Sequence, residues 1–283
     1  MSAENFLRDL PDDGLFLPEI KPHSFGKIQL HNYFARLFTS SMKSKWPQRA
    51  YVGLYSGAGR ARVVGTSEII ETTAMSVFRL PDPFTKYVFV DSDERCAAAL
   101  DARISALPGK HDFTIVHKDV NEAVADVRSA LPSYSASHGL LSFCFVDPFA
   151  ANLRFETLRA LGTLRMDFLI LLMFGLDARL NFRQYFGNRD DTRIADLIAC
   201  PDWREEYERS SDRNVVRFLT SKFDQAMRGM DYRPAQPSDY HTVTIPGRTV
   251  MQYLLAFYSK HELGRKLWQE SLKGSSPQLR LDF

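Results

Sequence analysis

YVGLYSGAGRARVVGTS, residues 51–67, is the stretch of sequence that decides the fold. Its first five residues are mostly apolar, as in a buried strand, and Ser56-Gly57-Ala58-Gly59 follows directly. Glycines at the end of a strand let the backbone approach a ligand, and the amides of the turn can face that ligand. The segment lacks the third glycine of a dinucleotide fingerprint and the Gly-Lys-Ser/Thr of a phosphate loop. Taken alone, it leaves two interpretations open: a ligand-binding loop, or a tight strand-to-helix turn that binds nothing.

Four further apolar runs follow, each rich in residues that favour strands. Successive runs begin 27 to 35 residues apart, which leaves room for a helix or a long loop after each one. Continuous rather than alternating hydrophobicity is typical of a strand that is covered on both faces. The pattern predicts an open parallel sheet flanked by helices. The runs are KYVFV (86–90), FTIVH (113–117), LLSFCFV (140–146) and DFLILLMF (167–174).

Helical segments surround these strands. Apolar residues repeat at helical spacing from 27 to about 42 and again between 181 and 233, and a final helix is expected at about 260–272. Two strand-like runs, 240–245 and 249–258, lie on either side of a Pro-Gly pair and predict a hairpin, so the sheet should end antiparallel.

These segments divide the chain into four parts. The parts are a polar N-terminal segment with a helix (1–49), the core of strands and helices (50–180), a helical insertion (181–235), and a closing hairpin with a C-terminal helix (236–283).

Composition limits the function classes. With 283 residues, 45% of them hydrophobic, the chain can form one large core or two modest ones. The 36 basic residues nearly balance 34 acidic ones, so any basic surface for nucleic acid must be local. Cys96, Cys144 and Cys200 are far apart and encode neither a disulfide framework nor a zinc site. Acids at the N-terminus argue against a signal peptide, and the apolar run 168–174 is far shorter than the ~20 residues of a membrane helix, so we expect a cytoplasmic protein that does not enter membranes.

Polar residues follow the strands at positions suited to a ligand. Asp91 ends the second strand run, where a carboxylate can accept hydrogen bonds from both ribose hydroxyls of an adenosine-containing ligand. Asp93, two residues later, suits a helix cap instead. Asp119 follows the third run and could face an adenine amino group, while Val120 could offer its amide. For Asp119 alone, capping is an equal alternative, but three strand ends at one crevice are harder to explain as caps.

The fourth strand run ends in Asp147-Pro148-Phe149. Proline fixes the chain direction after the carboxylate, the ring of Phe149 can stack on a planar substrate, and the carboxylate can accept a bond from an exocyclic amine. A strand-terminating Asp-Pro turn is the plainer alternative. The position of the motif, at the crevice of the glycine turn, favours an acceptor site.

Weaker candidates lie further along the chain. Asp177, Arg179 and Asn181 follow the fifth run and could line the acceptor side, although local capping explains them as well. Trp203 and Tyr207 could contact a polynucleotide, although a solvated charged helix face is an equal interpretation.

The order of these segments resembles the class I S-adenosylmethionine-dependent methyltransferase fold. More closely, it is similar to the three-Cys-motif partner family, TcmP, over residues 25–272. This resemblance implies a Rossmann-like α/β fold at 50–180, with a mostly parallel seven-stranded sheet, an antiparallel last strand, an N-terminal helix and a helical insertion. It also implies a three-cysteine, radical-SAM-like protein as a partner. The segments that carry it are FGKIQLHNYFARLF…W, YVGLYSGAGR…GTS, FVDPFAANLRFETL and FYSKHELGRKLW.

The resemblance assigns roles to matching residues. The glycine turn would hold the methionine and ribose end of S-adenosyl-L-methionine, Asp91 its ribose and Asp119 its adenine. Gly53 departs from the pattern, because many relatives have an acidic residue there that helps to place the ammonium group of the cofactor. The candidate cofactor residues are Tyr55, Ser56, Gly57, Ala58, Gly59, Asp91, Asp119 and Val120, and the candidate catalytic residues are Asp147, Pro148 and Phe149, with no metal ligand.

Three functions remain open from the sequence. The first is a methyltransferase that acts on an amino group of a nucleic-acid base, with nucleic acid as a partner. The second is a non-catalytic TcmP-type subunit that binds a substrate or another protein, which the glycine at position 53 favours. The third is a nicotinamide-dependent oxidoreductase, which the incomplete fingerprint disfavours. The sequence does not determine the oligomeric state.

Overall fold

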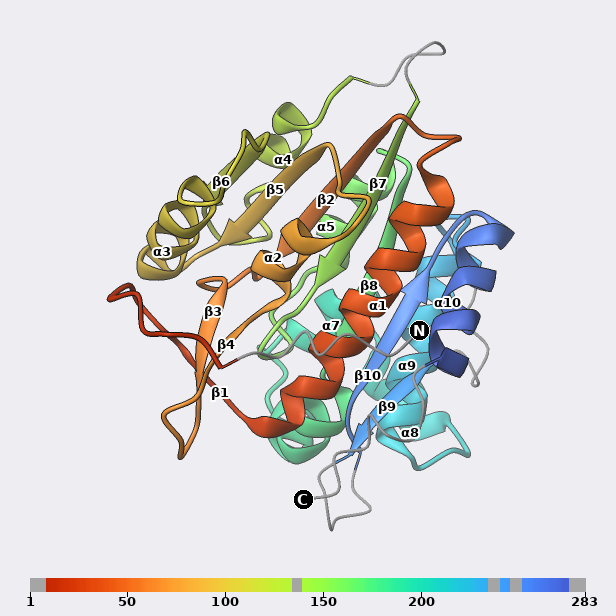
Figure 1. The fold of residues 1–283 in the computed structure, drawn as a ribbon. Helices are drawn as coiled ribbons and strands as arrows, with labels where there is room; N and C mark the ends of the chain where they lie inside the picture. The colour runs from red at the N-terminus through yellow and green to blue at the C-terminus, as the bar shows by residue number, and fades with distance from the viewer. Residues whose placement is uncertain (1–8, 134–138, 234–239, 245–250, 275–283) are drawn as a thin grey trace.

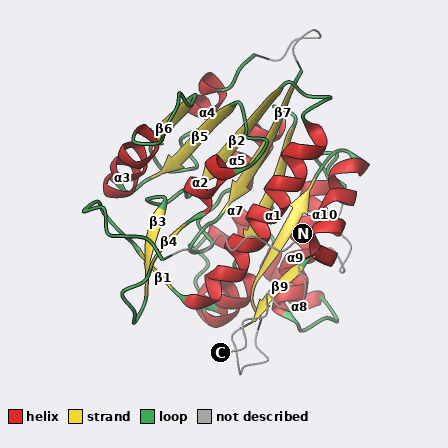
Figure 2. Ribbon diagram, viewed as in Figure 1, coloured by secondary structure: helices red, strands yellow, loops and turns green. Residues whose placement is uncertain are grey.

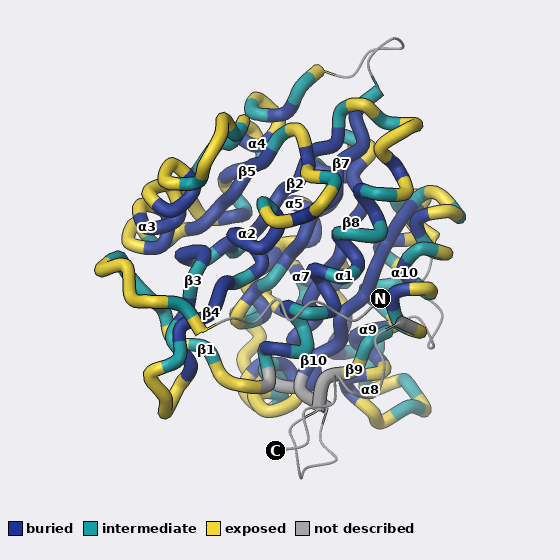
Figure 3. The backbone as a smooth tube through the Cα atoms, in the orientation of Figure 1, coloured by how far each residue is buried: buried dark blue, intermediate teal, exposed yellow. Residues whose placement is uncertain are grey.

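The computed structural model describes residues 9–133, 139–233, 240–244 and 251–274 (Figure 1). A large twisted sheet forms the middle layer, and helices cover both of its faces (Figure 2). The central strands of this sheet are buried along most of their length, whereas the edge strand formed by residues 113–117 is mostly of intermediate exposure (Figure 3).

Seven strands form the large sheet in the order β6-β5-β2-β7-β8-β10-β9. All neighbouring pairs from β6 to β8 are parallel, and β10 is antiparallel to both β8 and β9. The structure thus confirms the mostly parallel seven-stranded sheet of a Rossmann-like methyltransferase fold. The strands are β2 (Gln48–Leu54), β5 (Lys86–Asp91), β6 (Phe113–His117), β7 (Leu140–Val146), β8 (Met166–Leu172), β9 (His241–Thr244) and β10 (Met251–Tyr258).

Alternate residues of the central strand β2 enter two separate cores, because successive side chains of a strand point to opposite faces. Val52 packs in one core with helices α4 (Val124–Ala130), α5 (Phe155–Gly162), α7 (Arg193–Ile198) and α9 (Val215–Arg228). Tyr51 packs in the other, which is largely aromatic, with helices α1 (Phe25–Met42), α2 (Thr73–Ser76), α3 (Glu94–Ser105) and α10 (Glu262–Gly274). Continuous apolar strands therefore reflect burial on both faces, as the sequence predicts.

The predicted N-terminal helix is α1, and it lies beside α10 on one face of the sheet (Figure 1). Phe34 of α1 contacts Trp268 of α10 and Phe143 of β7 edge to face. The strands of the predicted closing hairpin are β9 and β10, while its Pro246-Gly247 turn lies outside the described residues.

The chain after the glycine turn differs from the prediction. No helix follows Gly59 directly; instead β3 (Arg60–Val63) and β4 (Ile69–Glu71) form an antiparallel pair before α2. β1 (Glu19–Ile20) adds to β3 and completes a second, three-stranded sheet, and the short 3₁₀ turns η1 (Pro22–Ser24) and η2 (Val77–Arg79) connect the neighbouring elements. The interpretation of residues 51–67 as a strand-to-helix turn is therefore wrong.

The helical insertion between β8 and β9 contains α6 (Phe182–Gly187), α7, α8 (Trp203–Arg209) and α9. Trp203 is fully buried, so neither the polynucleotide contact nor the solvated face considered for it is correct. Its ring packs edge to face on Phe182 and Phe186. The amphipathic spacing of the segment predicts helices, but it does not show that the side of α8 that carries Trp203 faces the core.

Candidate functional site

The carboxyl ends of four adjacent parallel strands bring the predicted residues to one edge of the sheet. Gly57 follows β2, Asp91 ends β5, Asp119 follows β6, and Asp147 follows β7. The amide of Asp147 donates to the carbonyl of Leu54, at 3.3 Å, so the acceptor motif abuts the strand that enters the glycine turn. In open α/β sheets, ligands bind at this edge.

The glycine turn has an unusual backbone. Gly57 and Gly59 have φ values of 64° and 80°, and Tyr55, which has a Cβ, also lies in the left-handed region at 62°. A Cβ at Gly59 would lie 2.6 Å from the side chain of Met75, whereas a Cβ at Gly57 would meet nothing within 4 Å. Gly59 is thus needed for packing, while the space beside Gly57 is open.

Gly53 has no room for a side chain. A Cβ there would lie 2.9 Å from Oγ of Ser56 and 3.0 Å from the ring of Phe89. The Ser56 hydroxyl donates to the Gly53 carbonyl at 2.8 Å. The serine therefore fills the position where the resemblance leads us to expect a carboxylate.

Asp91 links the second strand to the glycine turn. Its carboxylate is 9% exposed and accepts from the amide of Gly57 at 2.7 Å and from the amide of Asp93 at 2.9 Å. Each carboxylate oxygen keeps a further acceptor position, which a hydroxyl could use. Asp93 caps α3 by accepting from the amide of Arg95, as the sequence predicts.

Asp119 borders a polar cavity. The side chain is exposed, and Oδ1 accepts from the amide of Asn121 at 2.8 Å, while Val120 is buried. The cavity has a volume of about 400 Å³. It separates Asp119 from the start of α7 and is lined by residues that include Asn152, Arg154, Thr192, Arg193 and Asp196.

Asp147 is already paired, which the sequence did not predict. Lys27 of α1 donates to both of its oxygens, at 2.7 Å to Oδ1 and 2.6 Å to Oδ2. The side chains are only 12% and 20% exposed. Phe149, in contrast, is 81% exposed, so its ring is free to stack on a ligand. The partners are 120 residues apart, and nothing in the local pattern around Lys27 signals the contact.

A buried polar chain lies beneath this ion pair. His31 of α1 pairs through Nε2 with the hydroxyl of Tyr51 and through Nδ1 with Oδ1 of Asn32, each at 2.9 Å. Burial lowers the pKa of His31 to about 4 and raises the pKa of Tyr51 well above its usual value. Both shifts favour the neutral forms near pH 7, and the hydrogen bond between His31 and Tyr51 links α1 to β2.

Hydrogen bonds of Arg103 connect the N-terminal segment to the glycine turn. Arg103 of α3, 4% exposed, donates to the carbonyl of Ala58 at 2.6 Å and to that of Phe16 at 3.0 Å. Its other nitrogens donate to both oxygens of Asp13, each at 2.8 Å. The guanidinium lowers the pKa of Asp13 to about 2. Of these residues only Ala58 was predicted from the sequence, as part of the glycine turn, while Arg103, Asp13 and Phe16 were not.

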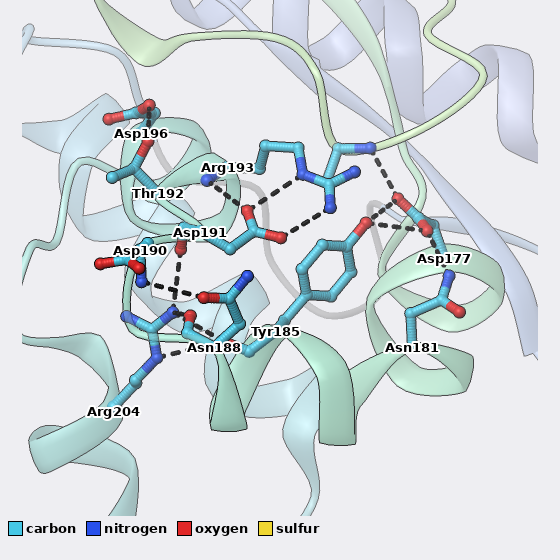
Figure 4. A network of polar contacts seen from close by, with 11 residues as sticks. Asp177, Asn181, Tyr185, Asn188, Asp190, Asp191, Thr192, Arg193, Asp196 and Arg204 are labelled. Atoms are coloured by element: carbon cyan, nitrogen blue, oxygen red, sulfur yellow. Dashed lines mark hydrogen bonds and ion pairs between the residues drawn. The ribbon is translucent and has the colours of Figure 1, made fainter.

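Figure 4 shows how the insertion is attached to this edge of the sheet. Asp177, in the π-helical turn η3 (Phe174–Ala178), accepts from the amide of Ala151 at 2.7 Å and from the side chains of Asn181 and Tyr185. Arg193 pairs with Asp191 and lies over the ring of Tyr185. Asp177 and Asn181 bond to each other and to neighbouring elements, so these contacts give both residues a structural role.

Arg204 anchors the next part of the insertion (Figure 4). It is 7% exposed and donates to carbonyls of residues around the end of α6, including those of Tyr185, Asn188 and Asp191.

Among the described residues, no group of three or more histidine, cysteine, aspartate or glutamate side chains is placed to hold a metal ion. Within the same ranges, none of the helices combines the length and apolar character that a bilayer crossing requires.

Comparisons with known proteins give similarities in fold. No protein-family model matches the chain, and no curated protein sequence matches it. A Legionella pneumophila protein of the family DUF519 has 10% identity and a TM-score of 0.48, over 90% of this chain and 93% of the other. Magnesium protoporphyrin IX methyltransferase from Synechocystis, with bound SAM, has 8% identity and a TM-score of 0.41 over 83% of each chain. Trm1 from Pyrococcus horikoshii, in complex with S-adenosyl-L-methionine, has 12% identity and a TM-score of 0.42, over 95% of this chain and 63% of the other.

Proposed function

We propose that this protein is a cytoplasmic S-adenosyl-L-methionine-dependent methyltransferase that acts on an amino group of a nucleic-acid base. The observation that carries the proposal is the bond between the Gly57 amide and Asp91 at the edge where Asp147 and Phe149 also lie. This bond fixes an open glycine turn beside a carboxylate, an arrangement suited to a nucleoside with two ribose hydroxyls.

The residues at the edge fit such a cofactor. The open space at Gly57 admits the amino-acid and ribose end, flanked by Tyr55, Ser56 and Ala58, while Gly59 keeps the turn closed against α3. Asp91 would accept from the ribose hydroxyls. Asp119 keeps Oδ2 for an adenine amino group, with the Val120 amide beside it.

The acceptor would lie at Asp147, Pro148 and Phe149. When bound, the cofactor supplies an activated methyl group, so the protein has mainly to position the acceptor nitrogen. The exposed ring of Phe149 would stack on the base, and Asp147 would accept from its amine once Lys27 has moved away. The guanidinium of Arg154, at the wall of the cavity, would contact a phosphate of the polynucleotide.

A relation to the TcmP family, and a radical-SAM-like partner protein, remain predictions of the sequence resemblance. Gly53 and the pairing of Asp147 with Lys27 would suit a non-catalytic subunit as well, but the carboxylates and the open turn lie together at one edge, which supports a cofactor site. The methyltransferase is therefore the function that the geometry supports best.

Calorimetric titration tests the cofactor class. We expect the wild-type protein to bind S-adenosyl-L-methionine and not NAD, and D91A to weaken binding at least tenfold, because the Gly57 amide loses its partner. D126A is the matched control, since Asp126 is an exposed aspartate paired with Lys118 away from the turn. Binding of NAD alone, or of neither ligand, would refute the proposal.

Methyl transfer tests the acceptor. With tritiated cofactor at saturating concentration, we expect the wild-type protein to label RNA or single-stranded DNA, and D147N to lose the labelling. Full labelling by D147N would show that the acceptor lies elsewhere.

A further inference from the structure

Lys27 stands where the proposed function places an acceptor amine. Its Nζ lies 2.6 and 2.7 Å from the two oxygens of Asp147, the distance at which a carboxylate holds a bound amine. The Asp147 amide bonds to Leu54, so this nitrogen lies over the edge that carries the glycine turn. The position is enclosed, since the side chain of Lys27 is only 12% exposed.

A cofactor bound for reaction would bring a positive charge close to this position. Reacting atoms in a productive complex lie about 3 to 3.5 Å apart, so the sulfonium would be about 5 Å from the acceptor nitrogen. Two like unit charges at about this distance repel strongly in a partly enclosed site, where the effective dielectric constant is about 20. Lys27 also removes the attraction that Asp147 would otherwise offer, because it contacts both carboxylate oxygens.

Two further carboxylates lie at this edge of the sheet. Asp91 accepts from two backbone amides, and Asp119 lies beyond it, at the end of the outermost parallel strand, β6. Gly53 and Ser56 leave no room for an acid beside the turn. Lys27 therefore cancels the charge of Asp147, and Asp91 and Asp119 are left as the carboxylates that can attract a sulfonium.

We propose, on the basis of the proposed function, that Lys27 is a specificity-determining residue: by pairing with Asp147 it weakens the preference of the resting pocket for the sulfonium S-adenosyl-L-methionine over the uncharged thioether S-adenosyl-L-homocysteine. An acceptor amine that displaces Lys27 from Asp147 moves the ammonium away and restores the attraction for the sulfonium.

Titration calorimetry with both nucleosides tests this inference through the ratio of their dissociation constants. K27M removes the charge and keeps an unbranched side chain of similar length, and K27Q is a second uncharged variant. We expect both to shift the ratio toward S-adenosyl-L-methionine by about tenfold, which allows for screening and side-chain movement. D147N, which leaves Lys27 without its counter-charge, should shift the ratio in the opposite direction.

Two control variants follow: one retains the positive charge at position 27, and the other removes a positive charge far from the site. K27R retains the positive charge and should leave the ratio close to that of the wild type. K43M removes the exposed Lys43–Asp82 pair at the other end of α1, about 24 Å along the helix, and should change neither constant. Equal weakening of both ligands in K27M and K27Q would mean a merely structural role for Lys27 and would overturn the inference. Failure of the wild-type protein to bind either nucleoside would instead refute the proposed function.

Discussion

Replacing Arg103 with methionine should cost this protein much more stability than its surface charges do. Only 2% of the Arg103 side chain is exposed, and its guanidinium donates to Asp13 and to the carbonyls of Ala58 and Phe16. R103M keeps most of the aliphatic volume but leaves two carbonyls and one carboxylate without this donor. Asp13 would retain Arg60, at 3.1 Å, as a charged partner and the amide of Leu15, at 3.2 Å.

The magnitude follows from this loss of partners. Removing one member of a buried ion pair costs about 3 to 5 kcal/mol, because the remaining charge stays desolvated. Asp13 is 24% exposed and can recover some hydration, so we expect R103M to lower the free energy of unfolding by about 3 kcal/mol. R62M is the matched control: Arg62 pairs with Asp12 in the same N-terminal segment, but both side chains are well exposed, and the loss should be about 0 to 1 kcal/mol.

Urea unfolding at pH 7, followed by circular dichroism, measures both values. A loss in R103M no larger than that in R62M would show that the contact between Arg103 and the glycine turn does not stabilise the fold. A change in the slope of the free energy against urea would indicate an altered unfolded or native state instead, and would call for a second variant, D13N.

Two further predictions concern backbone and burial. G59A should lower the free energy of unfolding by about 2 to 4 kcal/mol, because the new Cβ would meet Met75 and Leu100 at a residue with positive φ. The control G65A, at φ 81° with open space around it, should lower it by only about 1 kcal/mol. Equal losses for the two variants in urea unfolding would contradict this prediction. Burial raises the pKa of Asp167 to about 7 from 3.8, so the folded state holds an extra proton between these values. Stability should therefore fall as pH rises through that window, by at most about 4 kcal/mol, and D167N should flatten the dependence in urea unfolding at pH 5 and pH 8; an unchanged profile would refute it.

The sequence by itself determined the strands and the edge of the sheet. Five apolar runs became the strands β2, β5, β6, β7 and β8. All of these except the edge strand β6 are buried along most of their length, which is typical of continuous apolar runs. Since the strands are parallel, residues that follow them must meet at one edge, which is why Gly57, Asp91, Asp119 and Asp147 could be placed together from sequence.

Local patterns were weaker guides beyond the strands. The strands β3 and β4 are short, with four and three residues, and so brief a pattern does not distinguish a strand pair from a turn that enters a helix. Trp203 lies in a segment rich in charge, and its burial depends on Phe182 and Phe186 in a different helix.

Only the tertiary structure decided which charges meet. Lys27 reaches Asp147 across 120 residues, and Arg103 reaches Asp13 across 90, through contacts that no periodicity encodes. Hydrophobic spacing specifies the side of an element that is buried, but an ion pair depends on the distance between two elements after they have packed. The state of the candidate acceptor carboxylate is therefore a property of the packing of α1 on the sheet and not of the motif that contains it.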